Sequence, residues 1–352
     1  MKLGQSLAVL AAATPGLFTK ELEVALSGFE CELVVHSLKD VPTSLPDGLA
    51  IACIPRRENP TDSLVLAKRH CHLEASASSS GLSSLLYSLP AGSVVGTSSI
   101  RRAALLSRLA PHLTIADVRG NLNSRIAKLD KSEEEHSESD TQHYDALVLA
   151  TAGLLRLGWE SRISETFDVA HFGYGVSQGA LGLEMRVDLS SPLQAKLFDV
   201  LKSLQHPASA ARCAAERGLL RSLRGGCQVP LAVSSEVKSS EDGYALCLTA
   251  AVLSLDGSDM VQCAAECKVS LPDSHKNITA SSSKLVETGL LVARDAMGVG
   301  DQTYIEQALS LGETLAKQLL AQGAAEMLPG FTEADRPATY GSPELAGVPA
   351  RS

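Results

Sequence analysis

Between residues 91 and 156, short apolar runs alternate with segments of helical periodicity, and this alternation limits the possible folds more than any other feature. Residues 93–96, 113–118 and 145–151 predict buried strands, and each is followed by apolar positions at helical spacing. Strands that alternate with helices in short steps favour parallel sheets built from β-α-β units. We therefore expect an α/β protein. Because only 4% of the residues are aromatic, its cores must consist of aliphatic side chains.

The segments on either side follow other patterns. Before this region, we expect a helix near residues 18–29 and strands over 32–36 and 49–54. After it, the pattern changes to that of a separate α+β domain. That domain is predicted to contain a helix over 207–223, a hairpin of strands 244–255 and 260–271, and a closing helix ending at Gly323. Three segments are interpreted as surface loops or a disordered tail: 70–90, 131–143 and 330–352.

Charge, hydropathy and cysteine content exclude several classes of protein. The 352 residues carry a formal net charge of -9, whereas a general nucleic-acid binder needs clustered Lys and Arg. The longest apolar run, Ala146 to Leu155, is too short for a bilayer, which requires about 20 residues. The eight cysteines form no CxxC pair, and His70, Cys71 and His72 have no second ligand cluster for zinc. We expect a cytoplasmic protein with no nucleic-acid, membrane or metal partner, while the apolar start leaves a signal peptide as the alternative.

Hydroxyl and guanidinium groups gather where three consecutive predicted strands give way to helices. They are Thr97, Ser98, Ser99, Arg101 and Arg102 at the first junction, Arg119 and Arg125 at the second, and Arg156 at the third. A helix N-terminus attracts anions, and arginine matches carboxylate or phosphate with a planar fork. Because such junctions share one edge of a parallel sheet, we expect one cleft for a ligand with several negative charges. Plain N-caps and solvated arginines are the alternative at each junction.

Asp40 follows a predicted strand in a comparable position. Facing a cationic cleft, its carboxylate could serve as acid, base or counter-ion to a developing cation. The alternative is an Asx turn before Pro42. Lys39 is either a second anion contact or a solvated side chain, and His36 is interpreted as a core histidine.

Cys227 is the other unusual residue, because it follows Gly225 and Gly226. Two glycines let another group approach the sulfur closely, and nearby arginines would activate the thiolate as a nucleophile. A structural cysteine in a tight turn is the alternative.

Seven segments, in order along residues 16 to 325, together resemble the porphobilinogen deaminase (hydroxymethylbilane synthase) family. They are residues 17–23, 34–43, 96–102, 119–125, 150–159, 178–182 and 225–230. The resemblance implies two domains built like periplasmic binding proteins and a smaller C-terminal α+β domain. The expected boundaries are residues 1–57 with 176–200 for domain 1, 58–175 for domain 2, and 201–329 for the cofactor-attachment domain.

The resemblance also implies a transferase of porphyrin and heme biosynthesis. Such an enzyme condenses four porphobilinogen molecules, with loss of ammonia, into the linear tetrapyrrole hydroxymethylbilane. It carries a dipyrromethane cofactor attached through a thioether, here to Cys227. Matching positions imply that Asp40 is catalytic. They imply cofactor binding by Lys39, Thr97, Ser98, Ser99, Arg101, Arg102, Arg119 and Arg125, and substrate binding by Arg156, Gln178 and Gly179.

Residues 1–15 depart from the family pattern, which begins with a strand and a basic segment of Arg-Lys-Ser type. We expect that strand and its anion contacts to be missing, which would leave a neighbouring sheet edge exposed. The alternative function is therefore a catalytically impaired anion-binding homologue. In either case the expected partners are porphobilinogen and the growing oligopyrrole chain, bound to a monomer.

Overall fold

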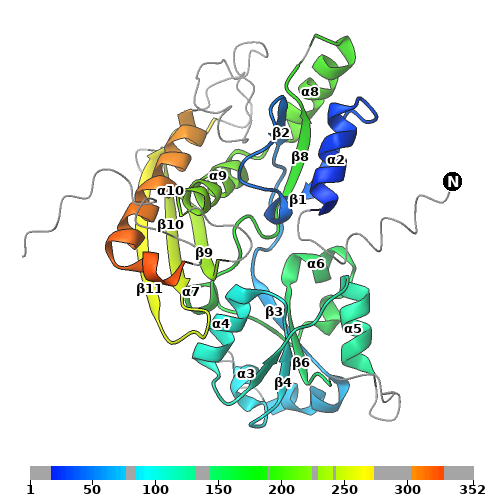
Figure 1. Ribbon diagram of the computed structural model, residues 1–352, viewed down its shortest axis with the longest axis vertical. Coiled ribbons are helices and arrows are strands. Elements are labelled where there is room, and N and C mark those ends of the chain that lie inside the picture. Colours follow the sequence, from blue (N-terminus) through cyan, green and yellow to red (C-terminus); the bar gives the residue numbers. More distant parts are fainter. Residues whose placement is uncertain are drawn as a thin grey trace, which may run out of the picture.

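The computed structural model describes residues 17–76, 84–131, 143–188, 190–223, 229–240, 243–272 and 303–328. The chain is a mixed α/β protein in which helices pack around three separate sheets (Figure 1). The α/β prediction is therefore confirmed. Residues 1–15, to which the expected loss of the first strand refers, lie outside the described residues.

The first sheet joins segments that lie far apart in the chain. Its order is β1-β8-β2, and both pairs are antiparallel. These strands are β1 (Val34–Ser37), β2 (Leu49–Cys53) and β8 (Leu181–Arg186). Helices α2 (Leu17–Ser27) and α8 (Pro192–Leu204) pack on this sheet, where Leu26 joins an apolar cluster with Leu49, and Phe198 joins another with Met185. The 3-10 turn η1 (Leu38–Asp40) continues directly from β1.

The second sheet has the order β5-β4-β6-β3-β7. Its strands are β3 (Asp62–Leu66), β4 (Val94–Gly96), β5 (Thr114–Ala116), β6 (Ala146–Ala150) and β7 (Glu165–Thr166). Strand β4 runs parallel to β5 and β6, as predicted, but β3 runs antiparallel to β6 and β7. The parallel arrangement expected from residues 91–156 is therefore confirmed for β4, β5 and β6. The antiparallel pairs involve strands outside that region or at its end, for which the sequence pattern gave no direction.

Five helices in the described part of the chain surround the second sheet. They are α3 (Ser84–Ser88), α4 (Ile100–Leu109), α5 (Leu122–Asp130), α6 (Thr151–Arg156) and α7 (Val169–Phe172), with 3-10 turns η2 (Lys68–Ser76) and η4 (Glu160–Arg162). Polar side chains cap α4, α5 and α7, whereas α6 begins at Ala150 without a side-chain cap from the described residues. Ser99 Oγ accepts the Arg102 N–H that opens α4, and Asn121 caps α5 in the same way. The prediction of a surface loop over residues 70–90 is partly wrong, because Leu85, Leu86 and Leu89 are buried in the core.

The third sheet is an antiparallel meander of order β11-β10-β9 that lies beside two long helices (Figure 1). Its elements are α9 (Pro207–Ser222), β9 (Leu231–Ser240), β10 (Gly243–Leu253), β11 (Met260–Val269), α10 (Thr303–Ala321) and η6 (Ala324–Met327). The predicted hairpin and both helices are confirmed, and Gly323 ends α10 with a φ of 96°. Gly312 lets α10 approach α9 closely, since a Cβ there would lie 2.2 Å from the carbonyl oxygen of Ala215. None of the helices described in the structure is both long and apolar enough to cross a membrane.

Candidate active site

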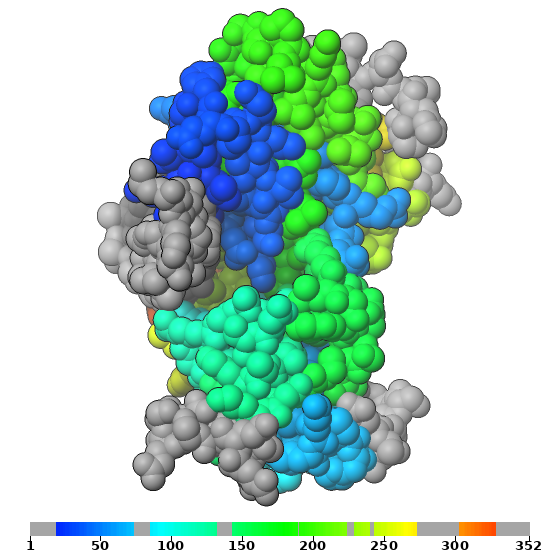
Figure 2. Space-filling view, turned by 90° about the vertical axis from the view of Figure 1, so that its right-hand side faces the viewer, coloured from blue at the N-terminus to red at the C-terminus, as the bar shows by residue number. Residues whose placement is uncertain are grey.

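The carboxyl ends of β4, β5 and β6 meet at one edge of the second sheet because these three strands are parallel and adjacent. The three predicted strand-to-helix junctions therefore share one edge. In Figure 2 a recess lies between the blue part of the molecule, which contains α2 and β1, and the blue-green part below it, which contains α5. A cavity of about 290 Å³ is lined by Lys39, Asp40, Ser98, Ser99, Arg101, Arg102, Arg125, Gly175, Val176, Gln178, Leu220, Val229 and Leu231. All three sheets, or the segments next to them, thus contribute to one site.

Arg101 and Arg102 extend from the first turn of α4 toward one buried carboxylate, that of Asp62 on β3. Arg101 Nη2 lies 2.5 Å from Oδ2 of Asp62, and Arg102 Nη2 lies 2.6 Å from Oδ1. Burial by itself would raise the pKa of Asp62, but the two guanidinium groups lower it to about 2. Two cations against one anion leave a net positive charge at this wall of the cavity.

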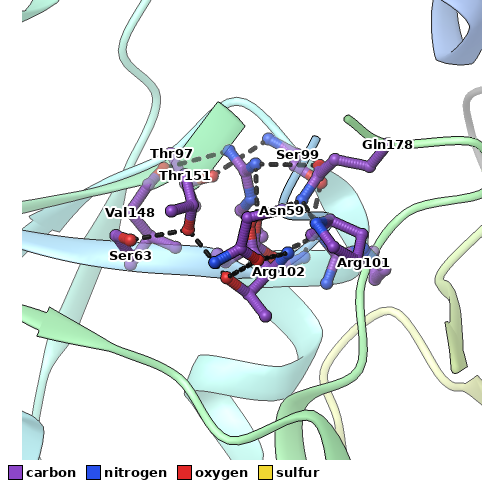
Figure 3. A network of polar contacts seen from close by, with 12 residues as sticks. Asn59, Ser63, Thr97, Ser99, Arg101, Arg102, Val148, Thr151 and Gln178 are labelled. Carbon is purple, nitrogen blue, oxygen red and sulfur yellow. Dashed lines mark hydrogen bonds and ion pairs between the residues drawn. The ribbon is translucent and has the colours of Figure 1, made fainter. Parts of the chain in front are cut away.

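Gln178 ties this cluster to the chain segment that returns to the first sheet. Its Nε2 donates to Oδ1 of Asp62 and to the carbonyl oxygen of Pro60, both at 2.7 Å, and its Oε1 accepts from Arg102. Figure 3 shows Gln178, from the segment that returns to the first sheet, beside Arg101 and Arg102 of α4. Arg57 Nε also donates to the carbonyl oxygen of Gln178 at 2.8 Å. Gln178 therefore links the chain around residues 57–62, its own segment and the arginine pair in one network.

Some donors in this network have no acceptor among the described residues. Arg101 Nη1 and Arg102 Nε are buried without a hydrogen-bond partner in that part of the chain. Burial lowers the pKa of Arg101 and that of Arg125, whose Nε donates to the carbonyl oxygen of Gly120 at 2.8 Å. A buried donor left unsatisfied costs free energy, so this wall is suited to an anionic ligand that accepts from it.

Lys39 and Asp40 also line the cavity, from the turn η1 that follows β1. The buried side chain of Leu38 anchors the turn, and Thr19 Oγ1 donates to the carbonyl oxygen of Asp40 at 3.3 Å. Both charged side chains are exposed at the cavity. The protein atoms around Lys39 nevertheless lower its pKa by displacing water. Asp40 opposes that shift, whereas Arg102 and Arg101 add to it.

Four residues implied by the family resemblance do not line this cavity. Thr97 is buried and its Oγ1 accepts from the backbone N–H of Ser99 at 3.2 Å. Arg119 is exposed, and its Nε donates to Asp117 at 2.6 Å. Arg156 Nη2 donates to the carbonyl oxygen of Gly179 at 2.7 Å, which places both residues at the chain segment that returns to the first sheet. The remaining described members of the set lie in the cavity lining.

Cys227 and its two glycines lie outside the described residues. Leu220 in α9 and Val229 come before and after that segment, and both line the cavity. His36 has the core position predicted for it, with its Nε2 2.7 Å from Oε2 of the buried Glu184.

Asp62 is the main site residue that sequence reasoning missed. A charged residue at the start of a short strand that continues Leu64-Val65-Leu66 is the signal that could have found it, because buried carboxylates require partners.

Comparison with known proteins identifies the family. Residues 4–192 match the family model described as porphobilinogen deaminase, dipyromethane cofactor binding domain, and residues 210–280 match porphobilinogen deaminase, C-terminal domain. The porphobilinogen deaminase of Nostoc sp. is 47% identical over 247 residues, which is 70% of this chain and 67% of that protein. That of Prochlorococcus marinus (strain NATL2A) is 41% identical over 293 residues, which is 83% of this chain and 79% of that protein. Because one family model matches more than half of the chain and these relatives match most of it, the chain belongs to the porphobilinogen deaminase family.

Proposed function

We propose that this chain is a hydroxymethylbilane synthase, a transferase that condenses four porphobilinogen molecules with loss of ammonia into a linear tetrapyrrole. The observation that supports this most is the cavity in which Asp40 and Lys39 share a lining with the buried pair Arg101 and Arg102. Each pyrrole unit carries an acetate and a propionate, so the growing chain is a polyanion. A cationic wall with a carboxylate beside it suits both that chain and a cation formed during the reaction.

The residues present fit a dipyrromethane group. Its carboxylates would accept from the buried donors Arg101 Nη1 and Arg102 Nε, which have no acceptor among the described residues. Lys39, Ser98, Ser99 and Arg125 belong to the same lining, and we assign Thr97 and Arg119 to this role from the family pattern. We propose attachment through Cys227, since Leu220 and Val229 line the cavity on both sides of its segment. When bound, the group supplies the pyrrole carbon to which the first porphobilinogen unit is joined.

Asp40 is the proposed catalytic residue. When the amino group of the aminomethyl substituent of porphobilinogen leaves as ammonia, the methylene carbon that stays behind and the pyrrole ring share a positive charge. A carboxylate positioned beside that charge stabilises it and can accept the pyrrole N–H proton in a later step. The lowered pKa of Lys39 makes its ammonium a readier proton donor than that of an ordinary lysine.

Substrate binding is assigned to Arg156, Gln178 and Gly179, which lie at the segment returning to the first sheet. We also propose the division into a discontinuous first domain, a second domain and a C-terminal cofactor-attachment domain, with the boundaries given above. The three separate sheets support it. The proposed cytoplasmic setting and monomeric state rest on the sequence.

Intact mass and ammonia release test this proposal directly. Purified protein should be heavier than its sequence by a two-pyrrole adduct that Cys227→Ser lacks, and it should release ammonia from porphobilinogen. Asp40→Asn should keep the adduct but lose at least about 100-fold in kcat. The matched control is Asp47→Asn, an exposed carboxylate in the turn before β2, which should retain wild-type kcat. Folded protein that binds porphobilinogen without releasing ammonia would instead favour the anion-binding alternative.

A further inference from the structure

Arg217, a residue of α9 with no role in the site described above, reaches the loop that carries Asp40. Its side chain is buried, with a residue exposure of 4%. Nη1 donates to the carbonyl oxygens of Leu38 and Val41 at 3.4 and 2.9 Å, and Nη2 donates to that of Pro42 at 2.5 Å. One guanidinium group thus contacts backbone on both sides of Asp40.

These contacts matter because the loop has few other ways to satisfy its backbone. Pro42 has no N–H and cannot continue a regular ladder, so its neighbours depend on donors from elsewhere. Within the loop, the Val41 N–H donates to Leu38 at 3.2 Å, and Thr19 of α2 donates to Asp40. Arg217 supplies further donors from helix α9, which packs beside the third sheet.

The charge of Arg217 is retained at neutral pH. Burial lowers its pKa to about 10, which still leaves the guanidinium protonated. Its Nε is buried with no acceptor among the described residues, so the cation is held mainly by backbone carbonyl dipoles. Replacing it with an apolar side chain would leave three carbonyl oxygens without this donor in a buried place, at a cost in free energy.

We propose that Arg217 is a positioning residue that holds the Lys39–Asp40 turn in register with helix α9 for the reaction proposed above. Cys227 follows Arg217 by ten residues in the sequence. Helix α9 therefore makes the contact with the Asp40 loop and also leads to the proposed attachment residue. Fixing the carboxylate relative to this helix sets where it stands with respect to the reacting atoms. A displacement of about 1 Å at such a group can cost about 100-fold in rate.

The test compares Arg217→Met and Arg217→Lys with Arg221→Met. Arg221 lies one turn further along α9 and contacts Glu313 at 3.4 Å, so it controls for loss of an arginine from this helix. We expect Arg217→Met to keep the two-pyrrole adduct and a KM within about twofold of wild type while kcat falls at least about tenfold. Arg217→Lys should recover part of the lost kcat, because an ammonium donates to some of the same carbonyls. Arg221→Met should retain wild-type kcat.

Amide hydrogen exchange supplies a measurement that does not depend on activity. The Val41 N–H should exchange faster in Arg217→Met than in wild type, and at the wild-type rate in Arg221→Met. An adduct-bearing Arg217→Met protein with unchanged kcat and unchanged exchange at Val41 would overturn the proposal. If Arg217→Met does not fold, Arg217→Lys decides the matter, because wild-type kcat and exchange in that variant would equally overturn it. Inactive wild-type protein would refute the proposed function, whereas the exchange result would still report on the loop contact.

Discussion

Asp62 and Arg102 form a buried ion pair, with Oδ1 and Nη2 2.6 Å apart, although 40 residues separate them in the chain. The same carboxylate also accepts from Arg101 and Gln178. The two arginines of α4 that the sequence assigns to ligand binding are therefore oriented by a residue of strand β3. This arrangement holds each guanidinium in one direction, which lowers the entropic cost of binding an anion.

Replacing Asp62 should destabilise the protein strongly. Asp62→Asn leaves two buried guanidinium groups without their counter-ion, and breaking a buried pair in this way costs about 3–5 kcal/mol. Urea unfolding measures the difference. The exposed Asp47→Asn substitution serves as control and should change the free energy of unfolding by no more than about 0.5 kcal/mol. Equal stability of the two variants would contradict the importance of the pair.

The same carboxylate should make stability depend on acid pH. Its pKa is lowered from 3.8 to about 2 in the folded protein, so below pH 4 the unfolded chain binds the proton more readily. The contribution of Asp62 to stability is therefore fully present above pH 4 and is lost as the pH falls from about 4 to about 2. Unfolding free energies measured across this range should fall more steeply for wild type than for Asp62→Asn, and parallel curves would refute this assignment.

We expect a side chain to be tolerated less well at Gly179 than at Gly48. Both residues have nearly the same φ, 83° and 82°, but a Cβ on Gly179 would lie 2.5 Å from the carbonyl oxygen of Glu58, whereas one on Gly48 meets nothing within 4 Å. Gly48→Ala should cost about 1 kcal/mol from backbone strain alone, and Gly179→Ala about 2–4 kcal/mol. Thermal unfolding compares them. Similar melting temperatures would show that the segments near residues 58 and 179 can separate freely.

Helix α3 should contribute to the core rather than act as a surface insertion. Leu86 is fully buried, so Leu86→Ala should lower the free energy of unfolding by about 2–5 kcal/mol through lost burial and a cavity. Leu157, which is half exposed, supplies the control, and Leu157→Ala should cost less than about 1 kcal/mol. Chemical denaturation of both variants checks this, and equal small losses would restore the surface-loop interpretation.

Much of the site could be predicted because its parts are encoded locally. Hydroxyls before a helical segment predict an N-cap, and Ser99 does cap α4. Arginines in the first turn then lie near the carboxyl end of the preceding strand, which is where Arg101 and Arg102 are found. Thr97 shows the limit of this reasoning, since its hydroxyl accepts from the backbone of Ser99 instead of lining the cavity.

Local periodicity thus specified the α/β class, the helices α4, α5, α9 and α10, and the edge of the sheet where cationic groups collect. Outside β4, β5 and β6, only the tertiary structure decided which strands pair and in which direction, as in the antiparallel pairing of Val34 with Glu184. It also decided that Asp62 neutralises part of the arginine pair and that Arg217 holds the Asp40 loop. Such contacts join residues far apart in the chain, and they depend on which buried charges and carbonyls find partners once the core has packed. The pairing of buried charges and carbonyls follows no periodic pattern in the sequence, so these contacts become defined only in the folded protein.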